Sequence, residues 1–160
     1  MRPKMRIEQP ACLFHAVIFS LQQAIQETRA NESIIISSHA AKFLKEYQQC
    51  LGHDLFVGKS LGDDCARLTE WISRQGAFAE AEFVRAGDDE HEFIMEGCSM
   101  AKAGVHKGMR PVNNICPMAM VAAALFKSHH PDADIIIEPS QFSASGSRSR
   151  IHCIELPLSP

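Results

Sequence analysis

The chain has 160 residues, of which 46% are hydrophobic and 22% are charged, and its formal net charge is -3. This length and composition are typical of one soluble globular domain with its own core, so we expect a single domain over residues 1–160. Basic residues cluster only at 2–6 and 148–150, which argues against a nucleic-acid-binding protein.

The apolar stretches are too short for a membrane-spanning helix, which needs about 20 consecutive apolar residues. The run from Ala11 to Phe19 follows basic residues as in a signal peptide, but His15 interrupts it and no small-residue cleavage site follows. We therefore expect a cytoplasmic protein that binds no membrane. In that compartment the six cysteines should be reduced thiols rather than a disulfide framework.

The N-terminal part, about residues 11–76, is predicted to form amphipathic helices. Apolar residues recur at helical spacing over 11–30, then over 37–51, and then from Leu61 to Gly76. The apolar stripe of the first helix is wider than one small sheet requires. We therefore expect it to contribute to a homodimer contact.

The C-terminal part, about residues 77–157, is predicted to contain two pairs of strands with a helix between them. The Gly87-Asp88-Asp89 sequence has the chemistry of a hairpin turn between the first two strands. This order predicts an α+β fold in which helices cover an antiparallel sheet. The expected elements are the strands Phe78 to Ala86 and Glu90 to Glu96, a short helix or helical loop over 98–108, a helix from Pro117 to about His130, and the strands Ala133 to Pro139 and Arg150 to Leu156.

The helix that begins at Pro117 is apolar and rich in alanine, and Cys116 stands directly before it. Proline is favoured at the first helical position, which places Cys116 at the cap. The free N–H groups and the helix dipole at this end favour negative charge. We therefore expect a stabilised Cys116 thiolate, suited to a metal ligand or a nucleophile. The side chains expected to face inward are Met118, Val121, Ala122 and Leu125.

A sparse set of residues over about 40–157 carries a family resemblance. Cys116 opens an alanine-rich helix, a strand ends at Glu138, Gly146 lies in a turn, and Cys153 precedes the end of the last strand. In these features the chain resembles the 4-vinyl-reductase domain family, of the NO-signalling/Golgi-transport ligand-binding superfamily. That superfamily also holds haem nitric-oxide-sensing domains and the TRAPP vesicle-tethering subunits. The resemblance implies a small-molecule-binding domain.

The resemblance also implies a metal site. In the zinc-containing phenol-sensing members, the ligands are a helix-opening cysteine, a strand-ending glutamate, a cysteine shortly after it, and a last cysteine. Three of these roles carry over to Cys116, Glu138 and Cys153, whereas Gln141 stands where the remaining cysteine is expected.

Cys98 or His106 can take the missing place, because Zn²⁺ accepts cysteine, histidine and carboxylate ligands and needs about four. We therefore expect Cys98, Cys116 and Cys153 to converge, with Glu138 or His106 as a further ligand. The bound group would be zinc or iron, the iron as an ion, a haem or an iron–sulfur cluster. An ordinary structural role for these residues stays open. The histidines without a partner pattern are His91, His129, His130 and His152.

Several methionines and phenylalanines gather near the predicted last helix, and methionine suits adaptable apolar pockets. We expect an apolar cavity between the helix over 118–126 and the sheet, although such a set can also be plain core. The expected lining residues are Phe93, Met95, Met118, Met120 and Phe142.

The function that these features favour is a small-molecule-binding module, a sensor or a carrier. Its ligand would be a small apolar or aromatic molecule, held beside a cysteine-rich metal site. The alternative is a cofactor-dependent enzyme or a haem or iron sensor that uses Cys116 and neighbouring cysteines and histidines. No catalytic or nucleotide-binding motif is found, and the sequence leaves open whether the protein is an enzyme.

Overall fold

The structure is a computed structural model that describes residues 56–74, 80–109 and 114–155, together with isolated positions between 18 and 54. The first two predicted helices, over 11–30 and 37–51, therefore lie outside the described residues except at those isolated positions. The predicted homodimer contact lies there as well.

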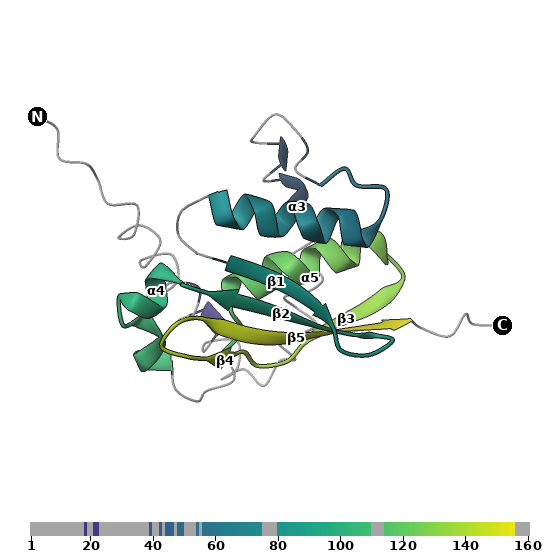
Figure 1. Ribbon diagram of the computed structural model, residues 1–160. Coiled ribbons are helices and arrows are strands. Elements are labelled where there is room, and N and C mark those ends of the chain that lie inside the picture. The colour runs from purple at the N-terminus through teal and green to yellow at the C-terminus, as the bar shows by residue number, and fades with distance from the viewer. Residues whose placement is uncertain are drawn as a thin grey trace, which may run out of the picture.

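The described strands form one antiparallel sheet (Figure 1). Its order is β1-β2-β5-β3, and the short β4 pairs with β5 beside β3. The antiparallel α+β architecture predicted from the sequence is confirmed. The strands are β1 (Glu80–Arg85), β2 (Glu90–Glu96), β3 (Ala133–Ile137), β4 (Gln141–Phe142) and β5 (Ser147–Glu155).

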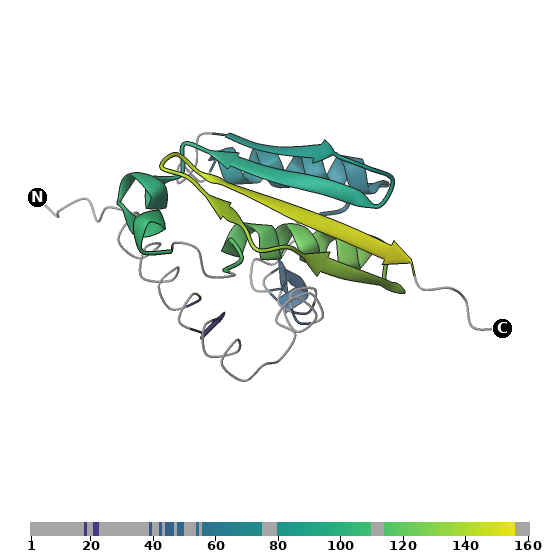
Figure 2. The same ribbon diagram turned by 90° about the horizontal axis from the view of Figure 1, so that it is seen from below.

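The two longer helices described, α3 and α5, pack on the same face of this sheet (Figures 1 and 2). Helix α3 (Leu61–Arg74) contacts β1, and α5 (Pro117–His129) contacts β3 and β5. The helices α4 (Ser99–Lys102) and η1 (Val105–Met109) follow β2 at one end of the sheet. Within the described ranges, no helix is both long and apolar enough to span a bilayer.

Strand β5 begins earlier than the sequence predicts, and β4 was not predicted. Ser147 and Ser149 are buried, whereas Arg148 and Arg150 are exposed, so this part of β5 alternates without a single apolar residue. A strand that buries serines has no hydrophobic periodicity, which is the main strand signal in a sequence. The predicted start at Arg150 is therefore wrong by three residues.

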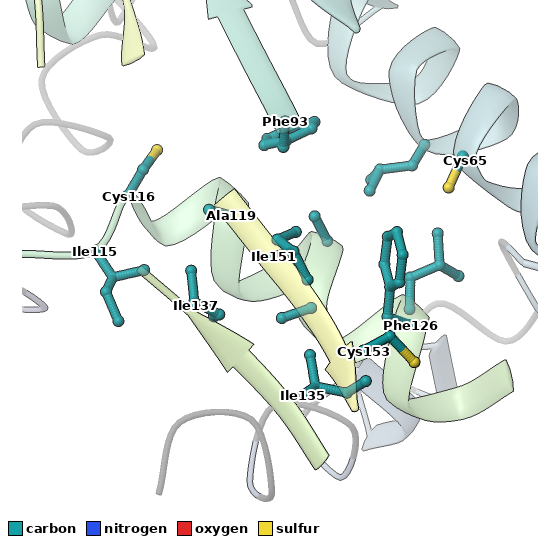
Figure 3. Packing of buried hydrophobic residues seen from close by; sticks show 14 of the residues in the cluster. Cys65, Phe93, Ile115, Cys116, Ala119, Phe126, Ile135, Ile137, Ile151 and Cys153 are labelled. Atoms are coloured by element: carbon teal, nitrogen blue, oxygen red, sulfur yellow. The ribbon is translucent and has the colours of Figure 1, made fainter. Parts of the chain in front are cut away.

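The core lies between the sheet and α5, as the close view in Figure 3 shows. Ala119, Ala122 and Ala123 are fully buried, and such small side chains let the helix backbone approach the sheet closely. Met118 and Val121, predicted to face inward, are only half-buried. The buried residues of α5 lie on more than one face of the helix, because it packs against α3 as well as against the sheet.

The turn before β5 depends on Gly146, which packs against the backbone of β2. A Cβ atom at this position would lie 1.7 Å from the Met95 carbonyl oxygen and 2.7 Å from its carbon. These are backbone atoms of a paired strand, so they cannot move aside at little cost.

We expect Gly146→Ala to lower the free energy of unfolding by about 1–3 kcal/mol or more, because the new methyl group overlaps β2. Gly62→Ala is the matched control, since a Cβ atom there meets nothing nearer than the Ser60 hydroxyl at 3.9 Å. It should leave stability unchanged or raise it by up to about 1 kcal/mol. Urea denaturation measures both. An unchanged Gly146→Ala midpoint would contradict this packing.

Candidate functional site

A cleft of about 420 Å³ opens between α3 and the sheet strands β1 and β2. Its volume falls within the range of about 300–1,000 Å³ that is usual for small-molecule sites. Small and apolar side chains make up much of its lining, with a few polar groups among them. The lining residues are Leu61, Gly62, Cys65, Ala66, Thr69, Ala81, Glu82, Phe83, Arg85 and His91.

The helical wall of the cleft follows from residue spacing in α3. Leu61, Cys65 and Thr69 recur every four residues, so they share one face of the helix. Ala66 lies beside this row and is exposed. Small side chains at this wall leave room between α3 and the sheet.

The sheet wall follows from strand alternation and register. Ala81, Phe83 and Arg85 alternate along β1 and therefore point to the same face. The antiparallel register sets His91 opposite Arg85, and Phe93 opposite Phe83. Phe83 lines the cleft, and its ring lies 4.8 Å between centroids from the ring of Phe93, which is buried in the core.

His91 is a neutral imidazole in this wall. Burial lowers its pKa, and the positive charge of Arg85 and the neighbouring His130 lower it further. Since the ordinary histidine pKa is about 6.5, the ring is uncharged at neutral pH. Its Nδ1 atom is buried without a hydrogen-bond partner among the described residues. His91 thus adds polarity to the cleft without a charge.

Cys65 lines the same cleft as a protonated thiol. Burial raises its pKa to about 12, and the adjacent Asp64 carboxylate adds to the increase. A thiol with this pKa carries almost no thiolate at neutral pH, and the thiolate is the nucleophilic form. Cys65 therefore acts here as a small apolar side chain.

The position of α3, and with it the cleft, depends on the buried carboxylate of Asp64. Its Oδ1 accepts a hydrogen bond of 2.6 Å from the Gly58 N–H, and its Oδ2 lies 2.8 Å from His129 Nε2. These contacts join the first turn of α3 to the preceding segment and to the last turn of α5. The pairing of Asp64 with His129 could not be predicted, because the two residues are 65 positions apart in the chain.

We expect Asp64→Ala to cost about 1.5–3 kcal/mol of stability, because it leaves the Gly58 N–H and His129 without their shared acceptor. Asp63→Ala is the matched control, since Asp63 is the neighbouring carboxylate and is exposed. Its effect should stay within about 0.5 kcal/mol. Thermal and urea unfolding of the two variants test the comparison. Equal stability of the two variants would show that the buried carboxylate is dispensable.

Cys116 and Cys153, both predicted metal ligands, lie at separate places in the core (Figure 3). The Cys116 thiol has a hydrogen bond with the side chain of Ser147, at the start of β5. Cys153 comes six residues later on the same strand, opposite Ile135. Six residues of strand span about 20 Å, so the two sulfur atoms cannot share one ion.

Of the other predicted ligands, Cys98 and His106 lie next to each other, whereas Glu138 pairs with His152, which was not a predicted ligand. Cys98 Sγ lies 3.9 Å from His106 Nε2, and Glu138 Oε1 lies 2.8 Å from His152 Nε2. Among the described residues, which include all five predicted ligands, no three His, Cys, Asp or Glu side chains form a group that could hold a metal ion. The expected convergence is not found. The zinc or iron cofactor stays a prediction for which these residues provide no ligand set.

The predicted Cys116 thiolate is also corrected. Cys116 caps α5 as expected, and Pro117 is the first residue of that helix. Ser147 and the backbone of Met118 and Ala119 lower the thiol pKa, but burial outweighs them and the pKa is raised. The Cys116 side chain makes no regular cap hydrogen bond with the backbone of α5. Cys116 is therefore a buried neutral thiol, because the free-energy cost of burying a thiolate exceeds the stabilisation that the helix N-terminus provides.

The cleft does not lie where the sequence predicted a pocket. Phe93 and Met95 are each 1% exposed and belong to the core beneath α5, and Met118, Met120 and Phe142 pack against that core. None of the five lines the cleft between α3 and β1. The predicted pocket beneath α5 stays a prediction, and the described cleft is a different site.

Comparison with solved structures shows a similarity in fold. No protein-family model matches this sequence, and no curated protein matches it either. A crystal structure of trafficking protein particle complex subunit 3 from Naegleria fowleri, covalently bound to palmitic acid, is similar with a TM-score of 0.50. The match covers 95% of this chain and 97% of that chain at 8% sequence identity. A likeness at this identity shows a shared fold alone.

Proposed function

We propose that this chain is a small-molecule-binding module, a sensor or a carrier, that holds an apolar or aromatic ligand in the cleft between α3 and β1. The observation that carries the proposal is the cleft itself, about 420 Å³ in volume, whose mainly apolar lining also includes Thr69, Glu82, Arg85 and His91. Binding sites for small molecules combine these same features.

The fold likeness supports an apolar ligand. The similar subunit from Naegleria fowleri was crystallised with palmitic acid, a molecule with a long apolar chain. The resemblance to the 4-vinyl-reductase domain family, which is itself a proposal, supports the same role. That family binds small molecules, and its superfamily includes subunits of the trafficking complex to which the similar protein belongs.

The ligand is held without a covalent bond. Among the described residues that line the cleft, Cys65 is the cysteine, and its raised pKa keeps it in the unreactive thiol form. His91 lies at the sheet wall, where its uncharged imidazole is placed to meet a polar end of the ligand. Glu82 and Arg85 also line this wall, and the Arg85 guanidinium donates hydrogen bonds to the Gly87 carbonyl and to Asp88. The apolar body would lie against Leu61, Ala66 and Phe83.

The alternative functions have less support from the described residues. An enzyme or an iron sensor built on Cys116 would use a thiolate, whereas burial keeps this thiol neutral. The metal site beside the pocket lacks a converging ligand set among the described residues. The homodimer and the cytoplasmic location remain proposals that rest on the sequence alone.

The test is binding of the fluorescent probe anilinonaphthalene sulfonate to the full chain, with palmitic acid and phenol as competitors. We expect saturable binding that a competitor reverses. Ala66→Phe should weaken binding at least about tenfold, or about 1.4 kcal/mol, because the ring fills the cleft from an exposed position.

Ala144→Phe is the matched control, because Ala144 is also exposed and lies in the turn before β5, outside the cleft. It should bind the probe as the unsubstituted chain does. Equal binding by Ala66→Phe, or no saturable binding by the unsubstituted chain, would overturn the proposal.

A further inference from the structure

We propose that Cys98 and His106 form a thiol–imidazole dyad that makes Cys98 the most reactive of the four described cysteines, open to oxidation by a small uncharged hydroperoxide. The dyad lies in the α4 and η1 region, outside the cleft, and is independent of the ligand-binding proposal.

The geometry sets the roles of the two side chains. His106 Nδ1 lies 3.0 Å from the Ser143 carbonyl oxygen, and a carbonyl only accepts hydrogen bonds. Nδ1 therefore carries the ring proton, which leaves the lone pair of Nε2 facing Cys98 Sγ at 3.9 Å. A nucleophile next to a base that a third group orients is the usual arrangement of an activated thiol. Such contacts are often long at rest and tighten on reaction.

The turn before β5 holds both members of the dyad in place. The Cys98 N–H donates a 2.8 Å hydrogen bond to the Ser145 carbonyl, two residues from the Ser143 carbonyl that orients His106. The ring of Phe142 packs edge-on against His106, with centroids 5.0 Å apart. The neighbouring Ser99 hydroxyl is buried without a hydrogen-bond partner among the described residues. A bound peroxide could satisfy such a group.

Cys116 provides a comparison within the same chain. Both cysteines cap a helix with nearly the same backbone angles, φ -62° and ψ 124° at Cys98 and φ -60° and ψ 127° at Cys116. Both are buried, at 3% and 4% exposure. They differ in their partners, since Cys98 faces an imidazole nitrogen and Cys116 faces the Ser147 side chain. A hydroxyl is too weak a base to take a thiol proton.

Cys98 and Cys116 lie in different clusters of buried residues. Cys116 belongs to the main core, whereas Cys98 belongs to a separate cluster with Met100 and Ala101, against which Val105 packs. A small uncharged oxidant would therefore reach Cys98 by local opening of the α4 and η1 region, which leaves the main core folded.

The reaction is a two-electron oxidation of sulfur. His106 Nε2 takes the thiol proton as the sulfur attacks one peroxide oxygen, and the O–O bond breaks. The leaving hydroxide takes the proton back from His106. The thiol and hydrogen peroxide thus become a sulfenic acid and one molecule of water, with the hydroperoxide as the oxidant.

The experiment exposes the reduced, chelator-treated full chain to substoichiometric hydrogen peroxide in the presence of dimedone, which traps sulfenic acid. Peptide mass spectrometry then gives the rate at each cysteine. We expect Cys98 to be trapped at least about tenfold faster than Cys116. His106→Asn should lower the trapping rate at Cys98 at least about tenfold and leave the rate at Cys116 unchanged. A general base typically contributes about 100-fold or more, so a tenfold loss is a conservative expectation. The asparagine amide can still donate to the Ser143 carbonyl but lacks the distal nitrogen.

His130→Asn is the matched substitution, because His130 follows α5 away from the dyad, and it should change neither rate. A rate at Cys98 no greater than at Cys116 in the unsubstituted chain would overturn the proposal, whether or not any variant folds. An unchanged Cys98 rate in His106→Asn would overturn it as well. A general rise at Cys65 and Cys116 would identify a variant that has unfolded, and the unsubstituted chain then decides alone.

Discussion

The carboxylate of Asp64 is the interaction on which the arrangement of α3, α5 and the cleft depends. A buried carboxylate is costly unless polar partners surround it, and here the Gly58 N–H and the His129 imidazole do so. Arg67 Nε lies 4.0 Å away and adds positive charge. These partners come from three separate segments, so satisfying one charge fixes where α3 begins relative to α5. Small residues of both elements, Gly62 and Ala66 of α3 and Ala81 of β1, line the cleft between them.

Helix α5 shows how burial can reverse the chemistry that a helix end favours. The alanine face of the helix lies tightly on the sheet, which removes Cys116 from water and keeps its thiol neutral. Cys65 and Cys153 are also neutral thiols, because burial and nearby carboxylates raise their pKa values. Among the described cysteines, Cys98 is set apart by a histidine nitrogen at its sulfur. The environment of each thiol, rather than its position at a helix end, therefore decides its chemistry.

Much of the fold could be predicted from the sequence, because it depends on local patterns. Apolar residues from Leu61 to Ile72 recur at intervals of four, three and four and predict α3. Pro117 marks the first residue of α5, and Gly87-Asp88-Asp89 predicts the hairpin. The site could not be predicted in this way. The sequence positions of distant cysteines do not reveal how far apart they lie in space. Cys116 and Cys153 belong to the same core cluster but lie at separate places in it. The cleft depends on small residues of two elements that no single pattern connects.

The central claim, an apolar ligand between α3 and β1, is tested most directly by a ¹H–¹⁵N NMR titration of the full chain with palmitic acid. Backbone amide shifts report where a ligand contacts the protein at every residue. If the ligand binds in the cleft, the largest shifts fall at the lining residues, between 61 and 69 in α3 and at 81–85 and 91 in the sheet. Shifts centred instead on 116–126 in α5, with the residues of the cleft unchanged, would contradict it.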